Sequence, residues 1–360
     1  MQRFVPFFSV GLVVVLVLVA ACSGVPTAQA PPPAATDTPQ AQLRLKVADG
    51  VTPVAALPQS ILTLAAKQGF FSRNGLDVDI QDVNGTPAII TAMRAGDIDV
   101  GIVNSADVIK LDADKSLEMR VIGSPNGRNF WMVVSRDDVN SLDDLRGRAY
   151  AISRVGSEDH SLVLTVLHAR GVDPSEINFQ VLGVPTIRVQ ALVAGQIAAT
   201  TTTVGTWVTI QDQPGVKVLV DQDDFWNTAP LMSNVSAVTL SVERDKSEAL
   251  RRYTHAMIET ARYYAQHKDD WVRDIGAIRT DIAPTTLAAL WDQYPTAWAV
   301  NGQLNPSTFQ KTSDYLYATA DFKDVPHIQV TDWIDTQFVD ESLAQMGVFP
   351  GVDDPGRGGH

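Results

Sequence analysis

A short segment that occurs twice constrains the fold of this chain more than any other feature. The first copy is GTPAIITAMRAGDID (85–99) and the second is GVPTIRVQALVAGQIAA (183–199). Each copy has the signals of a loop that leads into a helix, a helix stopped by glycine, and a short apolar strand. The repeat predicts two similar α/β lobes. The alternative is a coincidence between two units that use the same common turn signals.

The sequence between residues 43 and 240 alternates strand-like and helix-like stretches, which is typical of α/β domains with a largely parallel sheet. Further helices are expected at 243–267, 285–294, 306–320 and 328–343. Apolar strands at 130–134 and 236–240 could carry the chain out of one lobe and back. We therefore expect lobe 1 at 43–130 plus 237–345 and lobe 2 at 131–236. Two crossing segments would form a hinge beside a ligand cleft.

The N-terminus has the order of an export signal: Arg3, then an apolar run, then Ala20 and Ala21. Cys22 is the only cysteine, and the stretch LVAAC (18–22) resembles a bacterial lipobox. The resemblance implies cleavage after residue 21, lipidation of Cys22 and anchoring on the outer face of the cell membrane. Residues 22–42 would be a Pro-rich tether and 346–360 a flexible tail. A transmembrane helix and an unmodified cysteine are the alternatives.

Composition and spacing argue against several classes of function. Among 360 residues, 28 are basic and 41 acidic, and the net charge of −13 disfavours nucleic acid and anionic lipid as partners. The six histidines are scattered without a metal-binding spacing, so no metal and no cofactor are expected. The stretch RVGSEDH (154–160) lacks the Gly-x-Ser-x-Gly of a nucleophile elbow, and its neighbouring Asp159 and His160 diverge on a helix. We expect no catalytic residue there.

Four segments carry a resemblance to a known family: LAAKQGFFSRNGLDVDI (64–80), SLDDLRGRAYAISRVGSEDH (141–160), LHARGVDPSEI (167–177) and ALVAGQIAA (191–199). They resemble the SsuA-like solute-binding proteins for nitrate, sulfonate, taurine and thiamine pyrimidines, a group that also has riboflavin-binding members. The resemblance implies a two-lobe periplasmic-binding-protein fold and a ligand between the lobes. It also implies delivery to an ABC permease and its ATPase. We further expect a monomer that touches the membrane only through its lipid anchor.

Loops that precede helices at the carboxyl ends of strands are the expected ligand contacts. Thr86 and Ser157 are also expected to cap their helices with their side-chain oxygens. The aromatic residues Trp207, Phe225 and Trp226 could provide flat surfaces for a ring. The full set of predicted ligand-binding residues is Gln59, Thr86, Asn104, Gly156, Ser157, Thr203 and Trp207.

The acidic Glu158 and Asp159 would oppose a small anion if they faced the cleft, which favours a planar neutral heterocycle such as riboflavin or a thiamine pyrimidine precursor. A second hypothesis is sulfonate, taurine or nitrate, which would need Arg154, Arg128 or Arg188 in the cleft. An enzyme on the same fold would need cysteine or clustered histidine in the cleft. A surface lipoprotein that binds other proteins is the remaining alternative.

Overall fold

The computed structural model describes residues 43–50, 54–57, 60–83, 85–126, 128 and 131–350. The predicted export signal, the lipidated Cys22, the tether, Gln59 and the end of the chain from residue 351 lie outside the described residues. Within the described ranges, no helix has the length and apolar character needed to cross a membrane.

The first sheet belongs to lobe 1 and has the strand order β2-β1-β3-β10-β4. Its strands are β1 (Leu43–Asp49), β2 (Leu76–Asp82), β3 (Val100–Val103), β4 (Met119–Gly123) and β10 (Val235–Thr239). β1 pairs in parallel with β2 and β3, whereas β10 runs antiparallel to both β3 and β4. The strand that returns from lobe 2 is therefore inserted between two strands of the first half of the chain.

The second sheet belongs to lobe 2 and has the order β7-β6-β8-β5-β9. Its strands are β5 (Trp131–Arg136), β6 (Ala149–Ile152), β7 (Asn178–Val181), β8 (Ala199–Thr203) and β9 (Val216–Val220). Here β5, which arrives from lobe 1, is the antiparallel strand between β8 and β9. Both sheets thus have the same arrangement, with the crossing strand in the same place. The predicted two-lobe α/β fold is confirmed, and the residue boundaries of the lobes remain predictions.

The two copies of the repeated segment occupy equivalent places in the two sheets. The first forms α3 (Thr86–Ala95) between β2 and β3, and the second forms α6 (Pro185–Val193) between β7 and β8. Gly96 and Gly195 follow these helices with φ of 78° and 73°, a left-handed backbone that glycine adopts without strain. The prediction that the repeat marks two similar units is confirmed.

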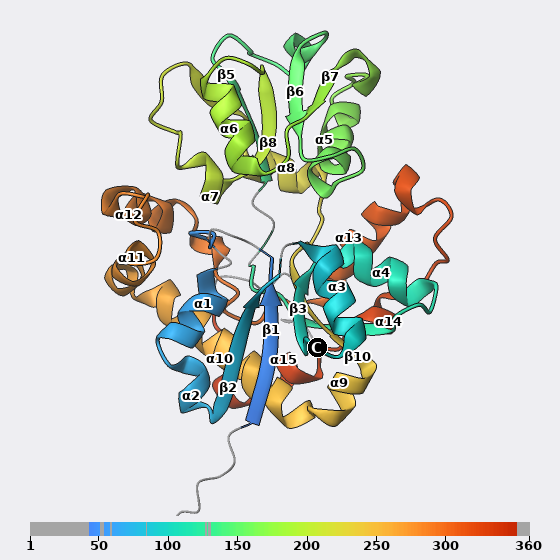
Figure 1. Cartoon of the computed structure of the whole chain (residues 1–360), viewed down its shortest axis with the longest axis vertical. Coiled ribbons are helices and arrows are strands. Elements are labelled where there is room, and N and C mark those ends of the chain that lie inside the picture. The colour runs from blue at the N-terminus through green and yellow to red at the C-terminus, as the bar shows by residue number, and fades with distance from the viewer. Residues whose placement is uncertain are drawn as a thin grey trace, which may run out of the picture. The chain divides into compact units, whose positions relative to one another are not determined.

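Helices surround both sheets (Figure 1). Lobe 2 has α5 (Glu158–Ala169), α6, α7 (Val204–Trp207), α8 (Gln222–Thr228), η1 (Asp143–Leu145) and η2 (Pro174–Glu176). Lobe 1 has α1 (Ser60–Lys67), α2 (Phe70–Arg73), α3, α4 (Ser105–Ala113), α9 (Leu240–Asp245), α10 (Ser247–Gln266), α11 (Lys268–Gly276), α12 (Pro284–Gln293), η3 (Pro295–Ala297), α13 (Pro306–Tyr317), η4 (Ala320–Phe322), α14 (Val330–Trp333) and α15 (Gln337–Met346).

The C-terminal helices complete the core of lobe 1. Trp271, Trp298 and Trp333 are among the largest fully buried side chains, and the rings of Trp271 and Trp298 meet edge to face. The long α10 contacts α1 and α15, so segments far apart in sequence share one core. Burial of these large side chains outweighs the entropy of ordering the long C-terminal segment.

Candidate functional site

A cavity of about 80 Å³ lies where elements of both lobes meet. On the lobe 1 side it is bounded by the start of α4, by the end of α13 and by η4. On the lobe 2 side it is bounded by the loop before α5 and by the first turns of that helix. Leu231 and Ser233, from the segment that returns to lobe 1, also line the cavity.

Two of these boundaries are helix N-termini at the carboxyl ends of strands. α4 starts two residues after β3, and α5 starts after the loop that follows β6. Free backbone N–H groups and the positive end of the helix dipole are concentrated in such first turns. The cavity therefore lies where open α/β sheets bind their ligands.

The loop between β6 and α5 is held by its own side chains. Gly156 has φ +72°, and its N–H donates to Nδ1 of His160 at 3.1 Å. Ser157 stands at the N-cap position, but its hydroxyl does not accept from the first turn of the helix. It lies 2.6 Å from both the Arg154 carbonyl and the Asp159 carboxylate, to either of which it can donate. The predicted capping bond of Ser157 is wrong because its hydroxyl is turned toward the preceding loop, where it also accepts from the N–H of Arg154 at 3.3 Å.

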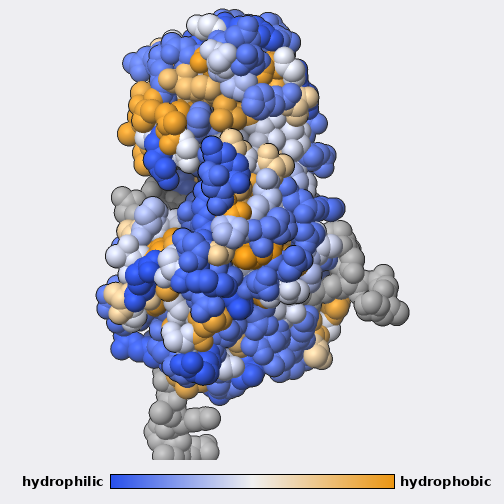
Figure 2. Space-filling view, turned by 90° about the vertical axis from the view of Figure 1, so that its right-hand side faces the viewer, coloured by the Kyte–Doolittle hydropathy of each residue, from blue (hydrophilic) through white to orange (hydrophobic). Residues whose placement is uncertain are grey.

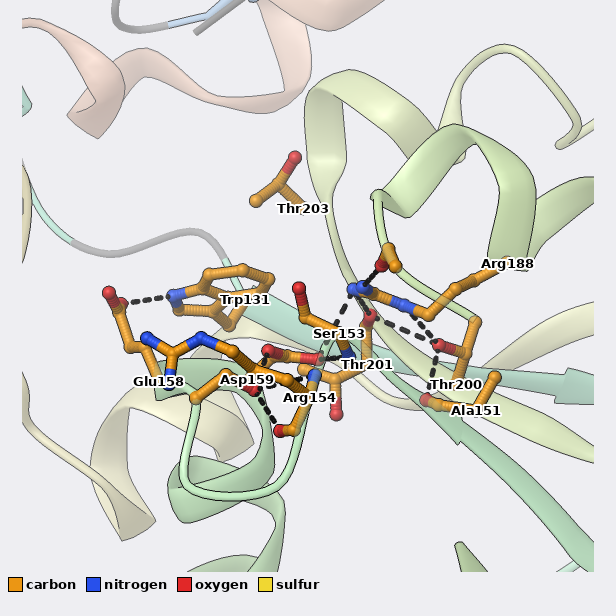
Figure 3. A network of polar contacts seen from close by, with 12 residues as sticks. Trp131, Ala151, Ser153, Arg154, Glu158, Asp159, Arg188, Thr200, Thr201 and Thr203 are labelled. Carbon is orange, nitrogen blue, oxygen red and sulfur yellow. Dashed lines mark hydrogen bonds and ion pairs between the residues drawn. The ribbon is translucent and has the colours of Figure 1, made fainter. Parts of the chain in front are cut away.

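Asp159 is buried and is directed toward Ser153 and Arg188 of lobe 2 (Figure 3), and it does not line the cavity. Its carboxylate accepts from the backbone N–H of Ser153 at 2.9 Å and lies 3.4 Å from Nη2 of Arg188. The side chains of Asp159 and Arg188 are 5 % and 1 % exposed, so this is a buried ion pair. Burial lowers the pKa of Arg188, while the Asp159 carboxylate raises it. Arg188 therefore has a structural role in lobe 2 and does not line the cavity.

Glu158, in contrast, lines the cavity. Its Oε1 accepts from Nε1 of Trp131 at 3.0 Å, and its Oε2 accepts from the hydroxyl of Ser233 at 2.7 Å. Trp131 opens β5 and Ser233 lies in the return segment, so one carboxylate ties α5 to both crossings (Figure 3 shows the Trp131 bond). Burial raises the pKa of Glu158 to about 7, although hydrogen bonds from Ser233 and Trp131 lower it.

Further hydrogen bonds join α5 to the elements of lobe 1 on the far side of the cavity. The hydroxyl of Ser161 donates to Asp321 at 3.1 Å, and the hydroxyls of Thr165 and Tyr315 lie 2.8 Å apart. Burial raises the pKa of Tyr315 to about 12, so its hydroxyl stays protonated at neutral pH. These contacts hold the cavity walls together.

The structure brings only part of the predicted site together. Asn104 and Gly156 line the cavity, and so does Arg154, the one arginine of the three candidates that does. Four predicted ligand-binding residues lie elsewhere, namely Thr86, Ser157, Thr203 and Trp207. Gln59 is outside the described residues. Contact of these five with a ligand stays a prediction.

The other candidate side chains have structural partners. Arg128 pairs with Asp223. Trp207 and Trp226 are half-buried and pack against the hydrophobic cores, and Phe225 is buried. The flat rings that favoured a heterocycle are thus part of the hydrophobic packing.

Several lining residues were not predicted from the sequence. Asp107 and Lys110 follow Asn104 by one turn and two turns of α4, and a helical repeat could have identified them. Ser233, Tyr315 and Asp321 come from the return segment and from the C-terminal helices, where no motif points to a site. Among the described residues, no group of three histidine, cysteine or acidic side chains could hold a metal ion.

Thr86 is positioned by a close approach of two glycines. α3 begins at Thr86 with Gly85 at the N-cap position, so the predicted capping role of Thr86 is wrong. A Cβ on Gly50, directly after β1, would lie 2.8 Å from the backbone nitrogen of Gly85 and 3.0 Å from the carbonyl oxygen of Val83. Backbone atoms cannot move aside as side chains can, so only glycine fits at residue 50.

Replacement of this glycine is expected to disturb the loop before α3. We expect Gly50→Ala to lower the free energy of unfolding by about 1–3 kcal/mol, because a methyl group must be forced against backbone. The measurement is urea denaturation of the full chain. Gly147→Ala is the comparison, because its Cβ would meet nothing within 4 Å and its cost comes only from φ +73°. Equal effects of the two substitutions would refute the steric account.

A family model described as NMT1/THI5 like matches residues 59–270 of the chain. Two curated relatives have partial matches. A putative binding protein YtlA of Bacillus subtilis (strain 168) is 26 % identical over 137 residues, which cover 36 % of this chain and 39 % of the relative. The taurine-binding periplasmic protein of Escherichia coli (strain K12) is 21 % identical over 212 residues, 58 % of this chain and 64 % of the relative. The chain thus spans less than two thirds of either.

The fold has a close counterpart among solved structures. The putative periplasmic sulfonate-binding protein SsuA from Methylobacillus flagellatus KT matches with a TM-score of 0.64 and 17 % sequence identity. The match covers 87 % of this chain and 99 % of that structure. At this level of identity the match establishes the shared fold.

Proposed function

Since the chain belongs to the NMT1/THI5-like family, we propose that it is the solute-binding component of an ABC importer. In this proposal the protein captures one small solute between its lobes and delivers it to a permease that is driven by an ATPase. The observation that carries the proposal is the cavity between the first turns of α4 and α5, one from each lobe. The chain crosses between the lobes twice, and such a two-stranded connection suits closure on a ligand.

The proposed solute is small and polar. The cavity of about 80 Å³ is well below the roughly 300–1,000 Å³ of pockets for drug-sized ligands. Its walls offer the amide of Asn104 and the hydroxyls of Ser233 and Tyr315. Charged side chains also line it. The comparisons give no support for riboflavin or a thiamine pyrimidine precursor. The half-buried Trp207 packs against the hydrophobic core, which weakens the supporting argument from aromatic rings. Solutes of the size of taurine, simple sulfonates or nitrate fit better.

Capture without chemistry is the role that the lining residues support. None of the described residues that line the cavity is a histidine or a cysteine, so its serines have no imidazole or thiol as a partner. The hydroxyl of Ser105 donates to the backbone carbonyl of Met232. The hydroxyl of Ser233 is directed to Glu158 and Asn104, and that of Ser161 to Asp321.

The permease and the membrane anchor are part of the same proposal. Val155 and Val184 follow the paired carboxyl ends of β6 and β7, and both are more than half exposed. Figure 2 shows apolar side chains gathered on lobe 2, above a largely hydrophilic lobe 1. An exposed apolar surface near the cavity suits contact with a membrane protein. Lipidation of Cys22 would keep the protein, a monomer in this proposal, on the outer face of the cell membrane.

The proposal is tested by a thermal-shift panel on the purified full chain. The panel contains taurine, ethanesulfonate, nitrate, riboflavin and a thiamine pyrimidine precursor. A true ligand at a hundredfold excess over its Kd adds about 2.7 kcal/mol of stability, which raises the melting temperature by several degrees. We expect one of the small polar members to do so. No shift with any member, together with no small molecule retained in native mass spectrometry, would favour a protein-binding lipoprotein instead.

A further inference from the structure

The charges around the cavity do not suit a plain anion. Among the described residues, three carboxylates line it against two cations: Asp107, Glu158 and Asp321 against Lys110 and Arg154. Two of the carboxylates stand in the first turns of α4 and α5, where backbone N–H groups would otherwise receive an anion. A nitrate or sulfonate placed there would meet like charge at close range.

The carboxylate of Glu158 is fixed in place and has bonding capacity left. Each of its oxygens accepts one hydrogen bond, from Trp131 at 3.0 Å and from Ser233 at 2.7 Å. A carboxylate has about four acceptor sites, so two remain for a further donor. Neither partner is a cation, and so the negative charge of Glu158 is not neutralised by the residues that orient it.

Asp107 faces the same cavity from lobe 1. It is half-buried, and burial raises the pKa of its carboxyl, while Lys110 and Arg154 lower it. The contrast with Asp159 is instructive, because Asp159 has a buried arginine as its partner and lies away from the cavity. Asp159 thus has its own buried counter-ion, whereas the hydrogen-bond partners of Glu158 at the cavity are neutral.

We propose that the solute carries a protonated amine, which Glu158 receives with the help of Asp107. This inference rests on the proposed function and names the chemical class of its solute: a small organic ammonium compound, which can be zwitterionic. An ammonium group brings up to three N–H donors and one positive charge to a wall of the cavity that offers acceptors and excess negative charge. Arg154 and Lys110 remain available for an acidic group at the other end of the same molecule.

The pH dependence follows from the protonation of Glu158. Burial raises its pKa to about 7, so the carboxyl is largely neutral at pH 6 and largely ionised at pH 8. An ammonium compound binds the ionised form, so its affinity should increase about tenfold from pH 6 to pH 8 and level off above. An anion without an amine should show the opposite trend. The charges of Asp107 and Asp159 also raise the pKa of Glu158. The other titratable and charged groups that line the same cavity are Lys110, Arg154, Tyr315 and Asp321.

The experiment compares matched pairs of compounds by calorimetric titration of the full chain: taurine with ethanesulfonate, β-alanine with propanoate, and ethanolamine with ethylene glycol. In each pair of which a member binds, the compound with the amine should bind at least about tenfold more tightly than its amine-free partner, as expected for a charge-assisted hydrogen bond. Glu158→Gln should remove this preference and the pH dependence, and Asp143→Asn, on exposed η1, should change neither.

Equal or tighter binding of an amine-free partner, or no binding in any pair, overturns the inference about the amine. If an amine-free member of the thermal-shift panel binds, the proposed function as a solute-binding protein stands, although the inference about the amine fails. Glu158→Gln is close in shape to the wild type, and an unchanged melting temperature confirms that lost binding does not come from unfolding. Retained preference for the amine in this variant would also overturn the assignment of Glu158.

Discussion

Replacement of Asp159 by asparagine is expected to lower the free energy of unfolding by about 3–5 kcal/mol. The guanidinium of Arg188 is 1 % exposed and lies 3.4 Å from the Asp159 carboxylate. With the carboxylate removed, a buried positive charge remains without its counter-ion. The amide oxygen of asparagine can still accept from the N–H of Ser153, so the substitution isolates the loss of charge. The measurement is the thermal midpoint from near-ultraviolet circular dichroism, which should fall by roughly 6 °C or more.

The double variant Asp159→Asn/Arg188→Met provides the decisive comparison. A buried pair that is replaced as a whole costs far less than one that is broken, so the double variant should recover much of the loss. Asp143→Asn, in an exposed pair with Arg146, should be close to wild type. A double variant that is less stable than Asp159→Asn would show that Arg188 contributes mainly through its bonds to Gly183, Thr200 and Thr201.

Ser161→Trp is expected to abolish solute binding while the fold is kept. Ser161 lines the cavity from α5, and its hydroxyl bonds to Asp321 on the opposite side. An indole side chain in a space of about 80 Å³ leaves no room for a solute. Each panel member that stabilises the wild-type chain should lose its thermal shift, which corresponds to at least a hundredfold loss of affinity.

Two controls separate occupation of the cavity from other effects. Ser161→Ala removes the bond to Asp321 without filling the cavity, so binding should persist in weakened form. Ser175→Trp places the same indole on an exposed turn of lobe 2 and should leave binding unchanged. Full binding by Ser161→Trp would place the solute outside this cavity.

The architecture was predictable because the sequence repeats the unit from which each lobe is built. The segments 85–99 and 183–199 form α3 and α6 with their glycine stops, and they lead directly into the apolar strands β3 and β8. The helices of the C-terminal half were harder to predict from the sequence. The helix expected at 328–343 is two helices, because the chain leaves α14 at Ile334 to form a bridge with Val121 of β4. α11 was missed, since its stability comes from the burial of Trp271.

The site was predicted only in part, because local pattern does not reveal what packs against a loop. Asn104 and Gly156 follow strands of the repeated units and were found from that position. The directions of Glu158 and Asp159 depend on Trp131, Ser233 and Arg188, which lie 27 to 75 residues away. Neighbouring acids on one helix therefore have different roles, one toward the cavity and one in the core.

The most direct test of the whole account is a crystal structure of the protein grown with taurine. We expect a bound molecule between Asn104 and Gly156, with its nitrogen within hydrogen-bond distance of Glu158. A molecule bound elsewhere, for example against Trp207, or an empty cavity in crystals at a taurine concentration that saturates the protein in solution, would contradict it.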